Sequence, residues 1–283
     1  MPYGDLAAWP TEVGPVAITT TEFDRIASFL RSATGIELRT GKEQLVIGRL
    51  DRRLRHHGIR SYTEYLQLIL TKKGQHERRI AIDLLTTNET YFFRESAHFD
   101  LLRKLAQEAP AAAKFRVWSA ASSTGEEACS IAMTLHDVLG PGRFEVMASD
   151  VSSRAVAAAR RGLYPIAAAE HIPRPLLSEY CLRGTGEHEG VMTVRADVRS
   201  HVRFAAVNLT EPLPDLGAEF DVVFLRNLLI YFAADTKRAV LERVVSTLRP
   251  GGTLLIGHAE TLTGLGVDGL ASVSPSVYRR IGR

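Results

Sequence analysis

The chain has 283 residues, of which 45% are hydrophobic and 24% are charged, as in ordinary soluble globular proteins. Its two cysteines, Cys129 and Cys181, exclude a disulfide framework and a cysteine-based zinc site. A net charge of only +3 gives no bulk-charge reason to expect a nucleic-acid partner. The N-terminus lacks the apolar core of a signal peptide, and no stretch is apolar enough to insert into a membrane, so we expect a cytoplasmic protein.

The first third of the chain is predicted to be a flexible tail followed by helices. Residues 1–17 are rich in proline and glycine, which break any periodicity. Apolar residues then recur three and four apart from Phe23 onward, and the same spacing returns in 41–57 and 62–70. We therefore expect an all-helical domain over residues 18–85.

Residues 86–98 are predicted to join two domains. They open with TTNETYFFRE (86–95), a polar and aromatic cluster that fits neither the helical nor the strand period. The aromatic side chains Tyr91, Phe92 and Phe93 are best explained as packing between the domains.

From residue 99 to 283 the pattern predicts an α/β domain. Strand candidates lie at 115–121, 144–150, 202–209, 220–232 and 253–257, with helical stretches at 129–139, 153–164 and 236–248 between them. This alternation indicates βαβ units and a mostly parallel sheet. The segment 184–204 interrupts it with three glycines and alternating apolar residues, and is expected to be a small antiparallel insertion.

The loop after the first strand indicates which cofactor the domain holds. In a doubly wound sheet, ligands bind beyond the carboxyl ends of the strands. The loop contains one glycine, Gly125, and two acids, Glu126 and Glu127, where a dinucleotide site would have G-x-G-x-x-G. Carboxylates would repel a pyrophosphate but suit a cationic sulfonium. The loop therefore favours S-adenosylmethionine over NAD.

Three more polar residues follow predicted strands. Asp150 ends the second strand, where a carboxylate can accept hydrogen bonds from ribose hydroxyls or can cap the next helix. Asn208 and Asn227 end later strands and suit either an adenine edge or a turn. Taken with Glu127, their recurrence at successive strand ends favours a ligand site.

Six segments resemble, in order, the motifs of CheR-type chemotaxis receptor methyltransferases. They are TTNETYFFRE, SAASSTGEEACSIAMTL, ASDVSSRAVAAARRGLY, RFAAVNL, FDVVFLRNLLIYF and LRPGGTLLIGHAE. The resemblance implies a helical N-terminal domain joined to a Rossmann-like methyltransferase domain with a small β-subdomain. It also implies methyl esterification of glutamates on methyl-accepting chemotaxis receptors, with S-adenosyl-L-methionine consumed and S-adenosyl-L-homocysteine released, to adjust receptor signalling for adaptation.

The resemblance also implies roles for individual residues. Those that reach over, bind or line the cofactor are Asn88, Thr90, Arg94, Glu127, Asp150, Asn208, Leu209, Asn227 and Leu228. Tyr231 would lie near the path of methyl transfer. One departure is visible, because Ala128-Cys129 stands where the family usually has Pro-Tyr.

The chemistry of that reaction requires little acid–base assistance. A glutamate titrates near about pH 4.3 and is already an ionised nucleophile at neutral pH. Positioning is the main demand, so we expect Arg94 to orient the carboxylate and Tyr231 to assist through its hydroxyl. The alternative for Arg94 is a surface ion pair with Glu95 or Asp100.

A basic stripe is predicted on the helix at 41–57. Helical spacing places Lys42, Arg49, Arg53 and His56 on one side of it. The stripe suits a solvated face, RNA, or the acidic methylation region of a receptor's cytoplasmic domain. The resemblance favours the receptor, with the protein a monomer recruited to receptor arrays.

The predicted insertion offers a strand edge to a receptor's C-terminal tail. No metal is expected, because the histidines lack ligand spacing. Two other readings stay open: a methyltransferase acting on RNA or a small molecule, and a noncatalytic cofactor-sensing module.

Overall fold

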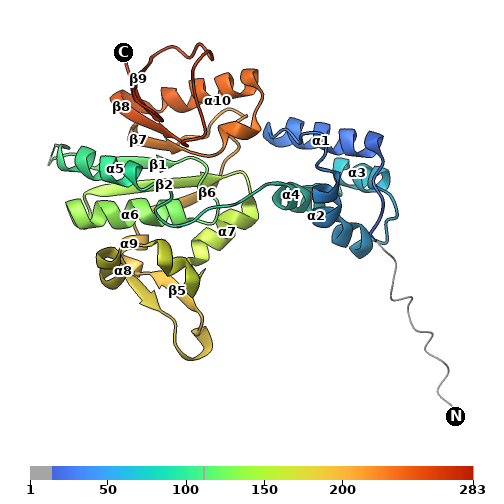
Figure 1. The fold of residues 1–283 in the computed structure, drawn as a ribbon, viewed down its shortest axis with the longest axis horizontal. Coiled ribbons are helices and arrows are strands. Elements are labelled where there is room, and N and C mark those ends of the chain that lie inside the picture. Colours follow the sequence, from blue (N-terminus) through green and yellow to red (C-terminus); the bar gives the residue numbers. More distant parts are fainter. Residues whose placement is uncertain (1–14, 111, 283) are drawn as a thin grey trace.

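The computed structural model describes residues 15–110 and 112–282. The predicted flexible tail therefore falls mostly on residues 1–14, outside the described part. Four helices follow in order: α1 (Thr20–Thr34), α2 (Glu43–His56), α3 (Tyr62–Leu70) and α4 (Gln75–Leu85). They form a helical body beside the larger domain (Figure 1).

The sequence marks the ends of the first helix clearly. Thr19 and Glu22 form a reciprocal capping box at its start, as the S/T-x-x-E pattern predicts. Gly35 ends it in the left-handed conformation at φ 77°, and a Cβ there would lie 2.7 Å from Thr210 Cγ2. Glycine is thus required both by the backbone and by the close approach of the larger domain. Phe23, Ile26 and other apolar residues of this helix are buried.

The larger domain is built on a seven-stranded sheet in the order β6-β2-β1-β7-β8-β10-β9. Its strands are β1 (Phe115–Ser119), β2 (Phe144–Asp150), β6 (Val202–Ala206), β7 (Phe220–Leu225), β8 (Leu248–Ile256), β9 (Leu270–Ser274) and β10 (Val277–Arg280). The first five strands of that order are parallel, and β10 runs antiparallel to β8 and β9. The predicted α/β class is confirmed.

Helices cover both faces of this sheet (Figure 1). On one face α5 (Ala97–Gln107) and α6 (Glu126–Leu139) pack in one apolar cluster with Val117, and on the other α10 (Ala234–Ser246) packs with Trp118. Neighbouring residues of β1 thus face opposite layers, as strand geometry requires. The helix α7 (Ser153–Arg161) follows β2 and contacts β6.

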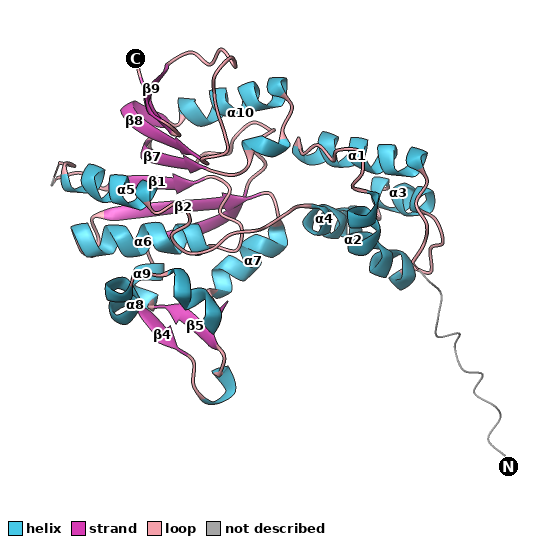
Figure 2. Ribbon diagram, in the orientation of Figure 1, coloured by secondary structure: helices cyan, strands magenta, loops and turns pink. Residues whose placement is uncertain are grey.

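The small antiparallel sheet begins earlier than the predicted 184–204. It consists of β3 (Tyr164–Pro165), β4 (Cys181–Arg183) and β5 (Val191–Val194), in the order β3-β5-β4. The short helices η1 (Ile166–His171), α8 (Arg174–Tyr180), η2 (Gly186–His188) and α9 (Ala196–Arg199) complete this subdomain, which projects from the main sheet in Figure 2. Its first strand is too short to leave an alternating pattern, and Val202–Ala206 belongs to the main sheet.

The prediction of one strand over 220–232 was wrong. The strand β7 ends at Leu225, Asn227 adopts the left-handed conformation at φ 56°, and η3 (Leu229–Tyr231) is a 3-10 turn. The reason lies in Glu260, whose carboxylate accepts the backbone N–H groups of Asn227 at 2.9 Å and Ile230 at 3.3 Å. Glu260, a buried acid distant in sequence, therefore bends the apolar segment 220–232, whose local pattern predicts an extended strand.

The helical body contacts the larger domain through the backbone. Asn208 Nδ2 donates to the carbonyl of Ala33 at 2.9 Å, and the Glu37 N–H donates to the carbonyl of Tyr231 at 2.8 Å.

None of the helices within residues 15–110 and 112–282 has the length and apolarity that crossing a bilayer requires.

Candidate active site

A cavity of about 580 Å³ lies at the carboxyl ends of the parallel strands, between the sheet and the helical body. It is where a doubly wound sheet places its ligand. All the residues expected at the cofactor or the methyl-transfer path line it: Asn88, Thr90, Arg94, Glu127, Asp150, Asn208, Leu209, Asn227, Leu228 and Tyr231. Lys42 and Arg49 line it from the helical body, whereas Arg53 and His56 are not among its lining residues.

Asp150 lies at the end of β2 with both carboxylate oxygens engaged. One oxygen accepts the N–H of Ser123 and the other the N–H of Ser152, each at 2.9 Å. Burial raises the pKa of this carboxyl, while the two amides oppose that rise. The cap of α7 is Ser152, whose hydroxyl accepts the Ala155 N–H at 3.1 Å. Asp150 is therefore free of the capping role and faces the cavity.

The loop after β1 turns sharply at Gly125, which has a φ of 97°. A Cβ there would lie 2.8 Å from Ala159 Cβ, so glycine lets the loop close against α7. The turn starts α6 and places Glu127 in the cavity wall. The carboxylate oxygens of Glu127 accept hydrogen bonds from Ser119 Oγ at 2.6 Å and from Arg226 Nη1 at 3.1 Å. Burial raises the pKa of Glu127, and the guanidinium of Arg226 opposes the rise.

The two asparagines hold the cavity wall in shape. Asn208 closes a turn, because its Oδ1 accepts the N–H of Thr210 at 3.1 Å while its Nδ2 reaches Ala33. Asn227 Nδ2 lies 3.4 Å from a carboxylate oxygen of Glu95. The turn interpretation of Asn208 is thus visible in the contacts, and both residues also line the cavity.

The segment 86–98 runs along the cavity and carries Arg94. Phe92 and Phe93 are buried in the cluster with α5 and α6, whereas Tyr91 is 38% exposed and lies beside His171. Arg94 is half-buried, and its Nη1 donates to the carbonyl of Glu89 at 3.0 Å. Glu95, which an alternative prediction paired with Arg94, pairs with Arg226 instead at 3.1 Å.

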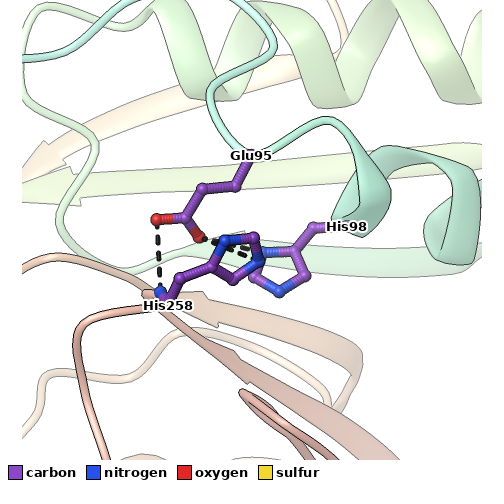
Figure 3. Close-up of side chains that lie close together, drawn as sticks. All are labelled: Glu95, His98 and His258. Atoms are coloured by element: carbon purple, nitrogen blue, oxygen red, sulfur yellow. Dashed lines mark hydrogen bonds and ion pairs between the residues drawn. The ribbon is translucent and has the colours of Figure 1, made fainter.

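Sequence reasoning missed a polar cluster at the end of this segment. Glu95 and His98, which are three residues apart, meet His258 from a distant part of the chain, as Figure 3 shows. Arg226 pairs with the same carboxylate. Burial and then Arg226 lower the pKa of His98 to about 4, so its ring is neutral at pH 7. The available signal was Arg226 itself, a charge inside an apolar run, which demands a buried partner.

The predicted basic stripe contains two side chains that bind other parts of the protein and two that are exposed to solvent. Arg49 donates to the carbonyls of Leu85 at 2.7 Å and Thr86 at 3.2 Å, and Arg53 forms an ion pair with Glu77 at 2.5 Å. Lys42 and His56 are exposed. The four residues share a helix side, but Arg53 serves the internal packing of the helical body.

The lining chemistry fits S-adenosylmethionine. Its innermost charged groups are the carboxylates of Glu127 and Asp150 and the guanidinium of Arg226, which already pairs with Glu127. The carboxylates favour a cationic ligand with ribose hydroxyls and disfavour a pyrophosphate.

Comparisons with known proteins agree with this geometry. Residues 88–274 match the CheR methyltransferase SAM-binding domain, and residues 21–86 match the CheR methyltransferase all-alpha domain. The "Chemotaxis protein methyltransferase" of Salmonella typhimurium is 40% identical over 252 residues, covering 88% of this chain and 87% of the relative. The protein of the same name in Escherichia coli has the same identity and coverage. S-adenosylmethionine is therefore the cofactor, and the chain belongs to the CheR methyltransferase family.

Proposed function

We propose that this protein methyl-esterifies glutamate side chains on methyl-accepting chemotaxis receptors and so adjusts receptor signalling for adaptation. The observation that carries the proposal is the division of charge in one cavity. The carboxylates of Glu127 and Asp150 line its floor, while the guanidinium of Arg94 borders it from the segment 86–98. The floor suits a cationic methyl donor and Arg94 suits an anionic acceptor. Relatives covering 88% of the chain carry the name chemotaxis protein methyltransferase, which supports this choice of substrate.

The residues present match what methylation of a carboxylate needs. S-adenosylmethionine supplies, when bound, a methyl group on a sulfonium, and an ionised glutamate needs no base to attack it. Arg94 orients the carboxylate, and the hydroxyl of Tyr231 assists from the wall formed by η3. The helical body forms part of the cavity wall and shields it from some of the bulk water, which helps because charge is neutralised as the new bond forms.

The receptor is expected to approach over the helical body. Lys42 and Arg49 stand at the cavity, and the exposed His56 continues the same side of α2. Positive charge there attracts an acidic receptor helix and raises the rate of encounter. The edge strand β4, where Leu182 is 54% exposed, offers a place for a receptor tail. We propose that the protein acts as a monomer recruited to receptor arrays.

The deciding experiment uses S-adenosylmethionine labelled in its methyl group and a receptor cytoplasmic fragment. The expected product is label on the fragment that mild alkali releases as methanol, because esters hydrolyse under conditions that leave N-methyl groups intact. The matched control is the same fragment with the acceptor glutamates changed to glutamine, which should take up no label. Alkali-stable label, or label on RNA instead of the fragment, would contradict the proposal.

A further inference from the structure

One arginine joins the cavity to the segment that carries Arg94. Arg226 follows β7, and its side chain is only 1% exposed. Its Nη1 lies 3.1 Å from Glu127 Oε2, and its Nη2 lies 3.1 Å from Glu95 Oε2. The same Nη2 donates to the backbone carbonyl of Arg94. A single planar guanidinium therefore contacts the cavity carboxylate and the segment 86–98 at once.

The backbone around this guanidinium is strained. Among the described residues, five non-glycine residues have positive φ: Phe93, Glu95, Ser123, Asn227 and Ser276. Ser123 and Asn227 line the cavity, Glu95 pairs with Arg226, and Ser276 Oγ lies 2.9 Å from His98 Nε2. Such conformations persist where surrounding contacts over-determine them, and they gather at functional sites. Of these five residues, Glu95 is held directly by Arg226, and Asn227 follows Arg226 in the chain.

The cluster also holds an excess of negative charge. Glu95 and Glu127 bring two carboxylates against one guanidinium, and the neighbouring His98 is neutral at pH 7. A metal ion held by Glu95, His98 and His258 would stand against the guanidinium that already lies 3.1 Å from the same oxygen. A cation in the adjoining cavity balances the excess without that repulsion.

We propose that Arg226 is a positioning residue, the shared counter-ion of Glu127 and Glu95, which sets the cofactor wall and the Arg94 segment in one arrangement. This inference rests on the proposed function, because it is there that Arg94 is given the role of orienting the methyl acceptor. A lysine cannot replace Arg226, because a single ammonium lacks the planar fork of N–H groups that reaches two carboxylates and a carbonyl together. The two parts of the site are therefore coupled through one side chain, which also lines the cavity.

The first test compares Arg226→Lys with Arg249→Lys. Arg249 also pairs with a carboxylate, Asp221, at 2.6 Å, but it is about half exposed and is not among the residues that line the cavity. Titration calorimetry should show affinity for S-adenosylhomocysteine falling about tenfold in Arg226→Lys, as expected for a displaced buried charge partner. Amide exchange in residues 88–95 should quicken in the same variant. Arg249→Lys should change neither. Wild-type affinity or unchanged exchange in Arg226→Lys overturns the proposal.

A second variant keeps the proposal testable if Arg226→Lys does not fold. Glu95→Gln preserves size and removes one negative charge from the cluster. Affinity for S-adenosylmethionine should fall about fivefold, and affinity for S-adenosylhomocysteine should fall less, because the product lacks the sulfonium charge. An unchanged affinity ratio together with unchanged exchange in 88–95 overturns the proposal. Both readouts are independent of any methyl acceptor, so they stand whether or not receptor glutamates prove to be the substrate.

Discussion

The two walls of the cavity are built on different physical principles. On the α/β side the charges of Glu127 and Asp150 are buried and held by hydrogen bonds at 2.6 to 2.9 Å from Ser119, Ser123 and Ser152. On the helical side Lys42 is exposed and keeps its water. Buried charges cannot be exchanged without leaving neighbours unsatisfied, whereas exposed charges act through a screened field. Substitutions on the first wall should therefore have large effects that resist salt, and those on the second small effects that depend on it.

The largest effect is expected where the walls meet, at Arg94. Arg94→Ala should lower the rate of receptor methylation about 100-fold or more, because a misplaced acceptor loses most of the benefit of orientation. Affinity for S-adenosylhomocysteine should stay within about threefold, since an orienting residue for the acceptor contributes little to product binding. Methyl incorporation and calorimetry measure the two quantities. Loss of product binding would contradict the assigned role.

A buried charge on the helical side should behave like those of the α/β side. Burial acts to raise the pKa of Glu77, but hydrogen bonds from Arg53, Tyr65 and His57 hold it at about 2. A depressed pKa stabilises the fold above the unfolded value of 4.5, and that stability is lost as pH falls from 4.5 toward 2. The shift corresponds to about 3 kcal/mol.

Glu77→Gln should accordingly lower the free energy of unfolding by about 3 kcal/mol at pH 7 and flatten its dependence on pH below 4.5. Urea unfolding followed by far-ultraviolet circular dichroism measures both. Glu64→Gln is the control, because Glu64 lies on the neighbouring helix α3 outside the Arg53 ion pair. Equal pH dependence in Glu77→Gln and the unmodified protein would refute the assignment.

Asp150→Asn tests the α/β wall itself. An amide offers one acceptor atom, so one of the N–H groups of Ser123 and Ser152 would face a donor. Losing one of these bonds lowers the stability of the loop, and an uncharged amide is also a weaker acceptor for ribose hydroxyls by about 2 kcal/mol, which corresponds to roughly a 30-fold loss of affinity for S-adenosylhomocysteine. Asp215→Asn is matched, because Asp215 Oδ1 also accepts a backbone N–H, from Gly217 at 2.8 Å, but is exposed. Equal affinities in the two variants would show that the wall is more adaptable than its contacts suggest.

The smallest effect is expected at Lys42. Lys42→Glu should raise the KM for receptor fragments about threefold at low ionic strength, and the difference should shrink as salt is added. Product affinity should not change. Arg53→Glu is a poor probe of the same surface, because it would break the ion pair with Glu77 and destabilise the helical body. A KM effect at Lys42 that is independent of salt would count against an electrostatic role.

The sequence alone determined those parts of the molecule that depend on local pattern. The helical spacing of Phe23 and its neighbours and the alternation of strands and helices predicted the fold class. Polar residues at strand ends predicted four residues that line the cavity, Glu127, Asp150, Asn208 and Asn227, whereas the others were implied only by the resemblance to a known family. The loop with a single glycine and two neighbouring acids predicted a cationic cofactor, and this signal is local too. Each of these signals lies within a few residues.

Only the tertiary structure decided contacts between residues far apart in the chain. Glu260 bends the run after Leu225, Glu77 removes Arg53 from the free surface, and Arg226 joins Glu95 to Glu127. A charged residue within an apolar stretch predicts that a partner for its charge lies nearby in the fold. Tertiary packing determines which residue that partner is, and no local periodicity encodes it.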